Sequence, residues 1–106
     1  MKRLTTTAER LTDRTRLSVH GELDLSTRDE LINAAVPALA SAQVLELDLA
    51  DVPFCDSSGI SGVLAIYRMS ADAGKHLVVT NPREQVRRAL DVSGVLDRLT
   101  AEDPPV

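Results

Sequence analysis

The sequence has little aromatic character, one cysteine, no strongly basic segment and no long apolar run. Phe54 and Tyr67 are its only aromatic residues, which argues against the readers of single-stranded nucleic acid that stack bases on aromatic side chains. The net charge of -4 also lacks the positive field that nucleic-acid binding requires. Because Cys55 has no partner for an internal disulfide, the chain fits a reducing compartment.

Targeting and membrane signals are also missing. The first residues contain no apolar core of a signal peptide, and no run approaches the roughly 18 apolar residues of a membrane span. We therefore expect a cytoplasmic protein with no membrane partner. The 106 residues, 43% hydrophobic and 26% charged, suit one globular domain. We assign that domain to residues 1–100, followed by a flexible C-terminal tail at 101–106.

The hydrophobic pattern predicts four strands. Apolar and polar residues alternate at 15–20 and again at 44–49, which is typical of half-buried strands. The wholly apolar run at 77–79 favours a central strand covered on both faces. Residues 3–10 are the candidate for an edge strand. Right-handed crossovers would make the strands at 15–20, 44–49 and 77–80 parallel.

Helices are expected between these strands. Ser26 is a suitable N-cap for the first, and Pro37 should kink that helix or end it near residue 36. The second spans 57–73, with Gly74 as its C-terminal cap. The third starts at Asn81-Pro82.

The third helix should end at residues 93–94, and 95–99 favour one or two further helical turns. Strands that alternate with helices in this order indicate an α/β fold, with a mixed sheet and helices packed against it.

The motifs of common enzymes are missing. Neither Ser57 nor Ser58 lies in a Gly-x-Ser-x-Gly elbow, and the chain has no glycine-rich phosphate loop. His20, Cys55 and His76 lack metal-ligand spacing, so the histidines are interpreted as surface or strand-end residues. No catalytic residue, metal or cofactor is therefore predicted. A small hydrolytic or nucleotide-dependent enzyme that uses Ser57 is the alternative that these absences weigh against.

The most informative segment is 51–62. A strand ends there, Asp56 follows, and Ser57, Ser58 and Gly59 begin a helix whose small residues would leave its first amides open to another surface. The alternative is ordinary helix capping and packing. No Lys or Arg occurs from 29 through 67, although six carboxylates do, which favours an acidic surface around the serines. The alternative is that Glu46 and Asp48 simply line a solvated strand face.

A second loop should lie beside this segment. Asp24 and Ser26 also follow a predicted strand, and the carboxyl ends of parallel strands meet at one edge of a sheet. The sequence therefore predicts that Asp24, Ser26, Asp56 and Ser57 share that edge. A loop-capping role is the alternative for Asp24.

These residues match a known family. Gly21-Glu22-Leu23-Asp24, the strand at 45–49, the segment Asp56-Ser57-Ser58-Gly59-Ile60, the run 77–79 and the segment 90–95 resemble the STAS domain of bacterial anti-sigma factor antagonists. The similarity extends from about residue 10 to residue 100. It implies a single STAS-like domain with a four- or five-stranded mixed sheet flanked by helices, and a binding protein rather than an enzyme. Pro37 and Cys55 depart from the family pattern.

The resemblance also implies partner switching. The unphosphorylated antagonist would bind an anti-sigma factor that is also a serine kinase, and so release a sigma factor, which is only an indirect partner. The kinase would phosphorylate the serine after the motif Asp, which is Ser57 here, and a phosphatase would reverse this. Partner contacts are expected from residues around this serine: Asp24, Ser26, Asp56, Ser58, Gly59, Ile60 and Ser61. The alternative within the fold is a non-switching scaffold, or an accessory domain of a transporter or stress-signalling assembly.

Overall fold

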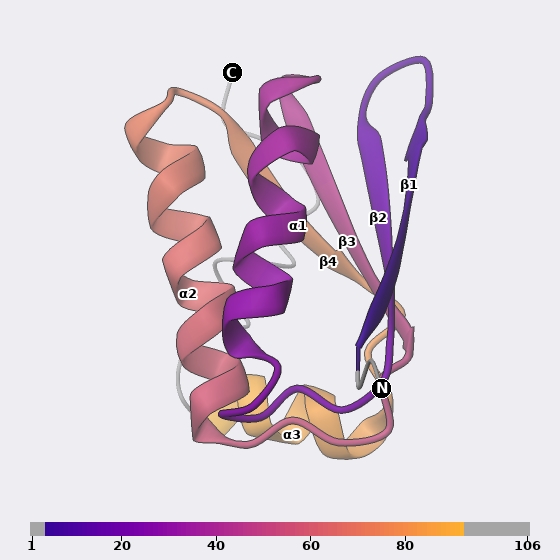
Figure 1. Cartoon of the computed structure of the whole chain (residues 1–106), viewed down its shortest axis with the longest axis vertical. Coiled ribbons are helices and arrows are strands. Elements are labelled where there is room, and N and C mark those ends of the chain that lie inside the picture. Colours follow the sequence, from indigo (N-terminus) through magenta and orange to yellow (C-terminus); the bar gives the residue numbers. More distant parts are fainter. Residues whose placement is uncertain (1–3, 93–106) are drawn as a thin grey trace.

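The computed structural model describes residues 4–92, which form four strands and three helices (Figure 1). In chain order these are β1 (Thr5–Arg10), β2 (Thr15–His20), α1 (Arg28–Ala40), β3 (Val44–Asp51), α2 (Ser57–Asp72), β4 (His76–Thr80) and α3 (Glu84–Val92). The predicted element order is confirmed over these residues. The helix end expected at 93–94, the further turns at 95–99 and the tail at 101–106 lie outside the described residues.

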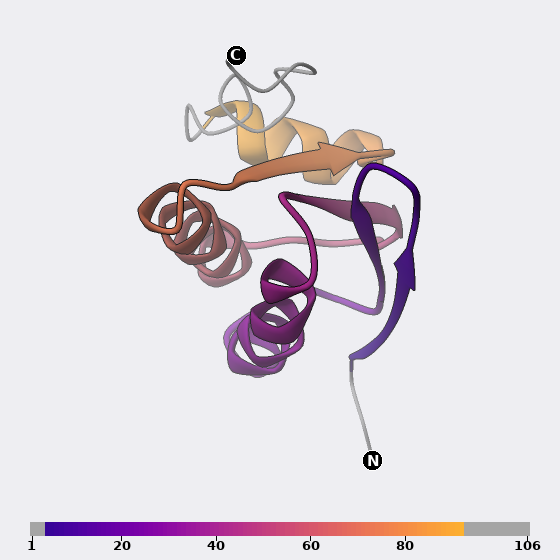
Figure 2. The ribbon, with the colours of Figure 1, turned by 90° about the horizontal axis from the view of Figure 1, so that it is seen from above.

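The strands form one mixed sheet in the order β1-β2-β3-β4. β1 pairs antiparallel with β2, whereas β2 with β3 and β3 with β4 are parallel, as the crossover rule predicted. The prediction that β4 is central was wrong, because β4 is an edge strand of this sheet. Its apolar run is nevertheless buried. Figure 2 gives the reason, since α1 and α2 lie on one side of the sheet and α3 lies beyond β4 on the other.

The core lies between the sheet and the helix pair. Leu17 of β2 and Leu47 of β3 point to the same side as the buried faces of α1 and α2, which contribute Leu31 and Ile66. Full burial of each such side chain contributes roughly 1.5–3 kcal/mol. This packing holds the carboxyl ends of β2 and β3, and the loops that follow them, at one end of the molecule. None of the helices in residues 4–92 has the length and hydropathy that a membrane crossing requires.

The first helix differs from its prediction at both ends. Its N-cap is Thr27 rather than Ser26, and the helix continues through Pro37 to Ala40. Pro37 removes the bond that its amide would have donated to the carbonyl of Asn33. Both residues are exposed, so water can reach that carbonyl, while the opposite face of the helix stays buried. The packing of that buried face outweighs the local cost of the proline.

Replacing Pro37 should therefore stabilise the protein. Pro37→Ala restores a helical hydrogen bond and removes the ring clash, a gain partly offset by the freer unfolded chain. We expect the free energy of unfolding to rise by about 1–2 kcal/mol in urea denaturation. Val36→Ala, an exposed control on the same helix, should change stability by no more than about 0.5 kcal/mol. A less stable Pro37→Ala variant would contradict this view of α1.

Candidate functional site

The two loops that follow β2 and β3 are held side by side by backbone hydrogen bonds. The amide of Leu23 donates to the carbonyl of Phe54 at 2.9 Å, and the amide of Asp56 donates to the carbonyl of Leu23 at 3.1 Å. Leu23 and Cys55 thereby form an isolated parallel bridge beyond the ends of the strands. Sheet-like pairing thus continues into the loops and brings the segment around Asp24 to the start of α2.

Gly59 is required by this contact. A Cβ at residue 59 would lie 2.5 Å from the carbonyl oxygen of Leu23 and 2.8 Å from Sγ of Cys55. No side chain fits at such distances, so only glycine lets the first turn of α2 pack against the preceding loop. The small residue therefore admits a surface of the chain itself rather than a partner, and Gly59 is buried. This is the packing alternative that the sequence had left open.

The first turn of α2 is capped by Asp56. Its Oδ1 accepts hydrogen bonds from the amides of Ser58 at 2.9 Å and Gly59 at 3.1 Å, and the amide of Ile60 bonds the Asp56 carbonyl at 2.9 Å. The prediction that these amides are open to approach was therefore wrong, because the carboxylate satisfies them. An anion at this end of the helix would meet the helix dipole together with the negative charge of Asp56.

Ser57 is the first residue of α2, and it is exposed. Its hydroxyl makes no hydrogen bond to any group in residues 4–92, so no base activates it there. His20 is occupied elsewhere, since its Nδ1 lies 2.8 Å from Oδ2 of Asp51. The geometry thus presents a free hydroxyl at a helix start, and within the described residues no cluster of side chains suits a metal ion.

Asp24 closes the neighbouring loop. Its Oδ1 accepts bonds from the amide of Ser26 at 2.9 Å, the hydroxyl of Ser26 at 2.6 Å and the amide of Thr27 at 3.2 Å. The hydrogen bond from the Ser26 hydroxyl is the main reason that the pKa of Asp24 is lowered, so this carboxyl is ionised at neutral pH. Asp24 therefore holds the loop that leads into α1, which fits the loop-capping alternative, and it adds a negative charge close to the start of α2.

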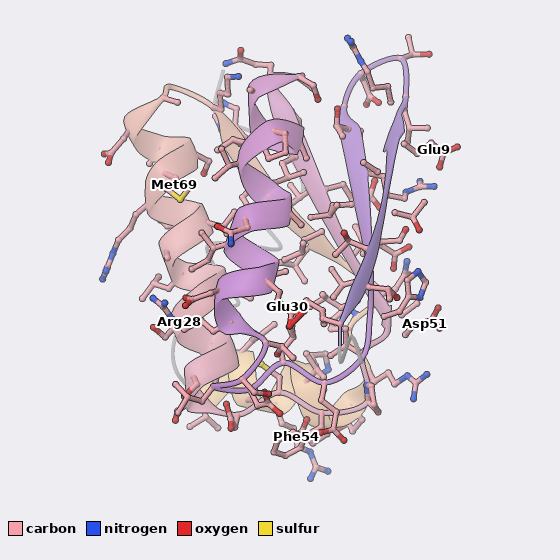
Figure 3. The ribbon with its side chains drawn as sticks, in the orientation of Figure 1. Glu9, Arg28, Glu30, Asp51, Phe54 and Met69 are labelled. Carbon is pink, nitrogen blue, oxygen red and sulfur yellow. The ribbon has the colours of Figure 1, made fainter. Side chains whose placement is uncertain are left out.

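The remaining predicted residues differ in accessibility. Ser26 and Ser61 are exposed, while Ser58 and Ile60 are partly buried. The hydroxyl of Ser61 accepts a bond from Nε of Arg28 at 3.3 Å, which links the first two turns of α2 to α1. Figure 3 shows Arg28 at this junction between the helices.

The carboxylates of segment 29–67 do not form one acidic surface. Glu46 is only 4% exposed and is bonded by Nε of Arg16 at 3.2 Å and the hydroxyl of Thr80 at 2.7 Å, with Arg14 also in contact. The interpretation of Glu46 as part of a solvated strand face was wrong. The arginines that contact Glu46 come from β2 and the residue just before it, so a run of like charges along the sequence does not form a surface of one sign in the fold.

An open groove separates the start of α2 from α3. It has a volume of about 630 Å³. Its lining comes from both elements: Cys55, Asp56, Ser57, Ile60, Glu84, Gln85, Arg88, Ala89 and Val92. One wall is fixed by Gln85, whose side-chain Oε1 accepts from the Cys55 amide at 3.0 Å and whose Nε2 donates to the Cys55 carbonyl at 3.3 Å. The Gln85 side chain thus bonds the Cys55 backbone as a neighbouring strand would, and so ties α3 to the loop that leads to Ser57.

Sequence reasoning missed four residues at this end of the molecule. Leu25 is 77% exposed and Phe54 is 40% exposed, in the two paired loops, and Figure 3 shows Phe54 projecting at the lower end. Gln85 and Arg88 enter from α3. The sequence did hold a signal for Leu25, because it is an apolar residue between the polar Asp24 and Ser26 in a predicted loop. No local pattern links Gln85 to a backbone segment thirty positions away.

Cys55 lies directly beneath the site and is chemically protected. Its side chain is 1% exposed, and burial, with a smaller effect of Asp56, raises the thiol pKa to about 12. Between pH 9 and 12 the unfolded thiol loses its proton while the folded thiol keeps it. Stability should therefore fall with rising pH, by up to about 1.4 kcal/mol per unit from this group.

Denaturant unfolding at pH 8 and pH 10 tests this prediction. Cys55→Ala is the control, because without the thiol its free energy of unfolding should fall less between the two pH values. A thiol reagent at pH 8 should also modify the native protein far more slowly than the unfolded chain. Rapid labelling of the native protein would contradict the buried, protonated thiol.

Comparison with known proteins agrees with this geometry. The family model described as "Mlab, STAS domain" matches residues 6–101. An anti-sigma-B factor antagonist of Bacillus subtilis (strain 168) is 27% identical over 81 residues, 76% of this chain and 74% of that protein. An anti-sigma factor antagonist from Mycobacterium paratuberculosis is 28% identical, with a TM-score of 0.74 over 97% of this chain and 87% of that one.

More distant structures share the fold. SpoIIAA, an anti-sigma factor antagonist, has a TM-score of 0.74 in its unphosphorylated form at 22% identity, over 89% of this chain and 84% of that one. Its phosphorylated form has a TM-score of 0.68 at 21% identity, over 89% and 87%. A sulfate transporter family protein from Wolinella succinogenes has a TM-score of 0.69 at 18% identity, over 82% and 71%. The matches therefore include proteins of more than one role on one fold.

Proposed function

The chain belongs to the STAS domain family, and from that premise we propose that it is an anti-sigma factor antagonist switched by phosphorylation of Ser57. In its unphosphorylated form it binds a cytoplasmic anti-sigma factor that is also a serine kinase, and a sigma factor is thereby released. A phosphatase restores the binding form. The similarity to two anti-sigma factor antagonists at 27% and 28% identity supports this role above the other roles of the fold.

The observation that carries the proposal is the state of the Ser57 hydroxyl. It is exposed, makes no hydrogen bond within the described residues, and lines the open groove between α2 and α3. A serine that served only to cap α2 would bond its amides, and Asp56 already does so. These features support Ser57 as the substrate hydroxyl for another protein, with the partly buried Ser58 as the poorer acceptor.

The transfer itself needs nothing from this chain except the hydroxyl. Oγ of Ser57 attacks the γ-phosphorus of an ATP held by the kinase, and the bond from that phosphorus to the leaving ADP oxygen breaks. The hydroxyl proton passes to a base of the kinase. The products are phosphoserine and ADP, so the chain is a substrate in this reaction and the cofactor belongs to its partner.

The added charge acts locally. A phosphate brings about -1.5 to -2 units of charge, next to the carboxylate of Asp56 and beside the loop that carries Asp24. Since Asp56 has already satisfied the first amides of α2, the helix end offers the phosphate its dipole, worth roughly 0.3–1 kcal/mol, and no free amide from Ser58 or Gly59. The fold tolerates the group in water, whereas an interface that excludes water does not.

Partner contact is proposed for the exposed part of this end. Leu25 and Phe54 supply exposed apolar anchors on the paired loops, and the exposed Ser26 and Ser61 and the carboxylates of Asp24 and Asp56 supply polar contacts. Buried apolar anchors contribute most of the affinity of such interfaces, and rim charges mainly guide association. Gly59 and Ser58 support this surface from below, and Ile60 lines its groove.

Phosphorylation of Ser57 is tested by incubating the protein with candidate anti-sigma kinases and ATP, followed by mass spectrometry. We expect one phosphate, on Ser57, and none on the Ser57→Ala variant. Thr7→Ala is the control, an exposed hydroxyl on β1 outside the proposed partner surface that should leave modification unchanged. Stable binding of a kinase without any phosphorylation would instead favour a non-switching scaffold.

A further inference from the structure

One face of α3 is directed at the groove beside Ser57. Besides Glu84, four α3 residues line it and recur at positions i, i+3, i+4 and i+7, as one helical stripe does: Gln85, Arg88, Ala89 and Val92. Gln85 is hydrogen-bonded to the backbone of Cys55, so Arg88, three residues further along this stripe, stands opposite the start of α2. Arg88 and Ser57 thus line the same groove, one from each of its two helices.

The groove is lined by two carboxylates and one guanidinium. Asp56 and Glu84 line it as carboxylates, and Arg88 is the only Lys or Arg among its lining residues. Nε of Arg88 donates to Oε2 of Glu84 at 3.0 Å, but the two side chains are 75% and 63% exposed. A pair this exposed is weak. The terminal N–H groups of Arg88 have no partner within residues 4–92, so they are available to an incoming acceptor.

We propose that Arg88 binds the phosphate of phosphorylated Ser57, and that this pair bridges α2 and α3 across the groove. The proposal rests on the proposed function in that it assumes modification of Ser57. A phosphate dianion offers three strong acceptor oxygens, and the planar fork of a guanidinium binds two of them at once. Such a ligand competes well with the single charge of Glu84 for the same arginine.

The bridge between Arg88 and the phosphate changes the surface that a partner would contact. In the unphosphorylated protein the groove is open, and the apolar side chains of Ile60 and Val92 are accessible from it. Arg88 drawn over to residue 57 places a charged pair across this groove. Phosphorylation therefore acts twice, by placing charge beside Asp56 and by putting a polar bridge where a partner would meet these apolar side chains.

The test uses full-length protein with phosphoserine installed at residue 57 during synthesis, so that no kinase is needed. The second ionisation of the phosphate, ordinarily near pH 6, is followed by phosphorus NMR in the otherwise unchanged protein and in the Arg88→Ala and Arg87→Ala variants. Arg87 is the matched control, because it also pairs with Glu84, at 3.8 Å, but does not line the groove. Arg88→Lys, which keeps the charge without the fork, should retain part of the effect.

We expect Arg88→Ala to raise the phosphate pKa by a few tenths of a unit or more, and Arg87→Ala to leave it unchanged. Equal values in all variants would overturn the proposal, and so would equal shifts in both alanine variants, since those would reflect the diffuse field of α3. Failure of every kinase to modify Ser57 would count against the proposed function and leave this result intact. Thermal unfolding of the unphosphorylated variants checks that each is folded.

Discussion

Gly59→Ala should abolish the native arrangement of the site. The added Cβ would lie 2.5 Å from the Leu23 carbonyl and 2.7 Å from the Leu23 Cβ, and a backbone atom cannot yield as the end of a long side chain does. Helix propensity favours alanine by about 1 kcal/mol, but overpacking against backbone costs about 3 kcal/mol or more. We expect a net loss of at least about 2 kcal/mol in the free energy of unfolding, measured by urea denaturation.

Gly62→Ala is the matched control for this substitution. Gly62 lies on the same helix, but its new Cβ would meet Cγ of Arg28 at 3.2 Å, which is part of a flexible side chain. The shift of Arg28 and the gain in helix propensity nearly cancel, so stability should stay within about 1 kcal/mol of the unchanged protein. Similar losses in both variants would show that Gly59 holds no special contact with the loop of Leu23.

Ser57→Asp should weaken binding of the cognate anti-sigma factor by a hundredfold or more. The new carboxylate stands next to Asp56 and near Asp24, and desolvating a third like charge in the interface costs about 3 kcal/mol. Ser57→Ala removes only the hydroxyl and should bind within a few-fold of the unchanged protein. Titration calorimetry measures both affinities, and circular dichroism confirms that the exposed substitutions leave the fold intact.

Ser61→Asp separates this effect from general acidity. It places the same charge on the same helix one turn further on, next to Arg28, which can neutralise it. We expect a loss of binding no greater than about tenfold. If Ser57→Asp and Ser61→Asp weaken binding equally, net charge rather than the position of residue 57 decides the affinity.

The parts of the fold that the sequence predicted are those governed by local rules. Alternation located β2 and β3, and the step from Asp56 into small residues located the start of α2, because periodicity and capping act over a few neighbouring residues. Pro37 is an exception, because the local rule for proline predicted a kink or an end near residue 36, whereas α1 continues to Ala40. The buried face of α1 overrides its local preference, and no single-sequence pattern measures the strength of that packing.

The site was predictable only in part. The pairing of the Asp24 and Asp56 loops follows from parallel strands, which the order of elements implied. The reason for Gly59 depends on the Leu23 carbonyl, and the role of Gln85 depends on the Cys55 backbone, so both are set by tertiary contacts. The acidic run in the sequence suggested a uniform field, whereas the fold buries Glu46 between two arginines and brings Arg88 to the groove.

The most direct test of the switch compares one protein sample in two charge states. The purified chain is phosphorylated to completion by its cognate kinase, half is treated with a phosphatase, and calorimetry then measures the affinity of each half for that kinase. The account predicts that the dephosphorylated half binds at least a hundredfold more tightly, and that Ser57→Ala protein binds equally well before and after the same treatments. Equal affinities for the two halves, with the phosphate mapped to Ser57, would contradict it.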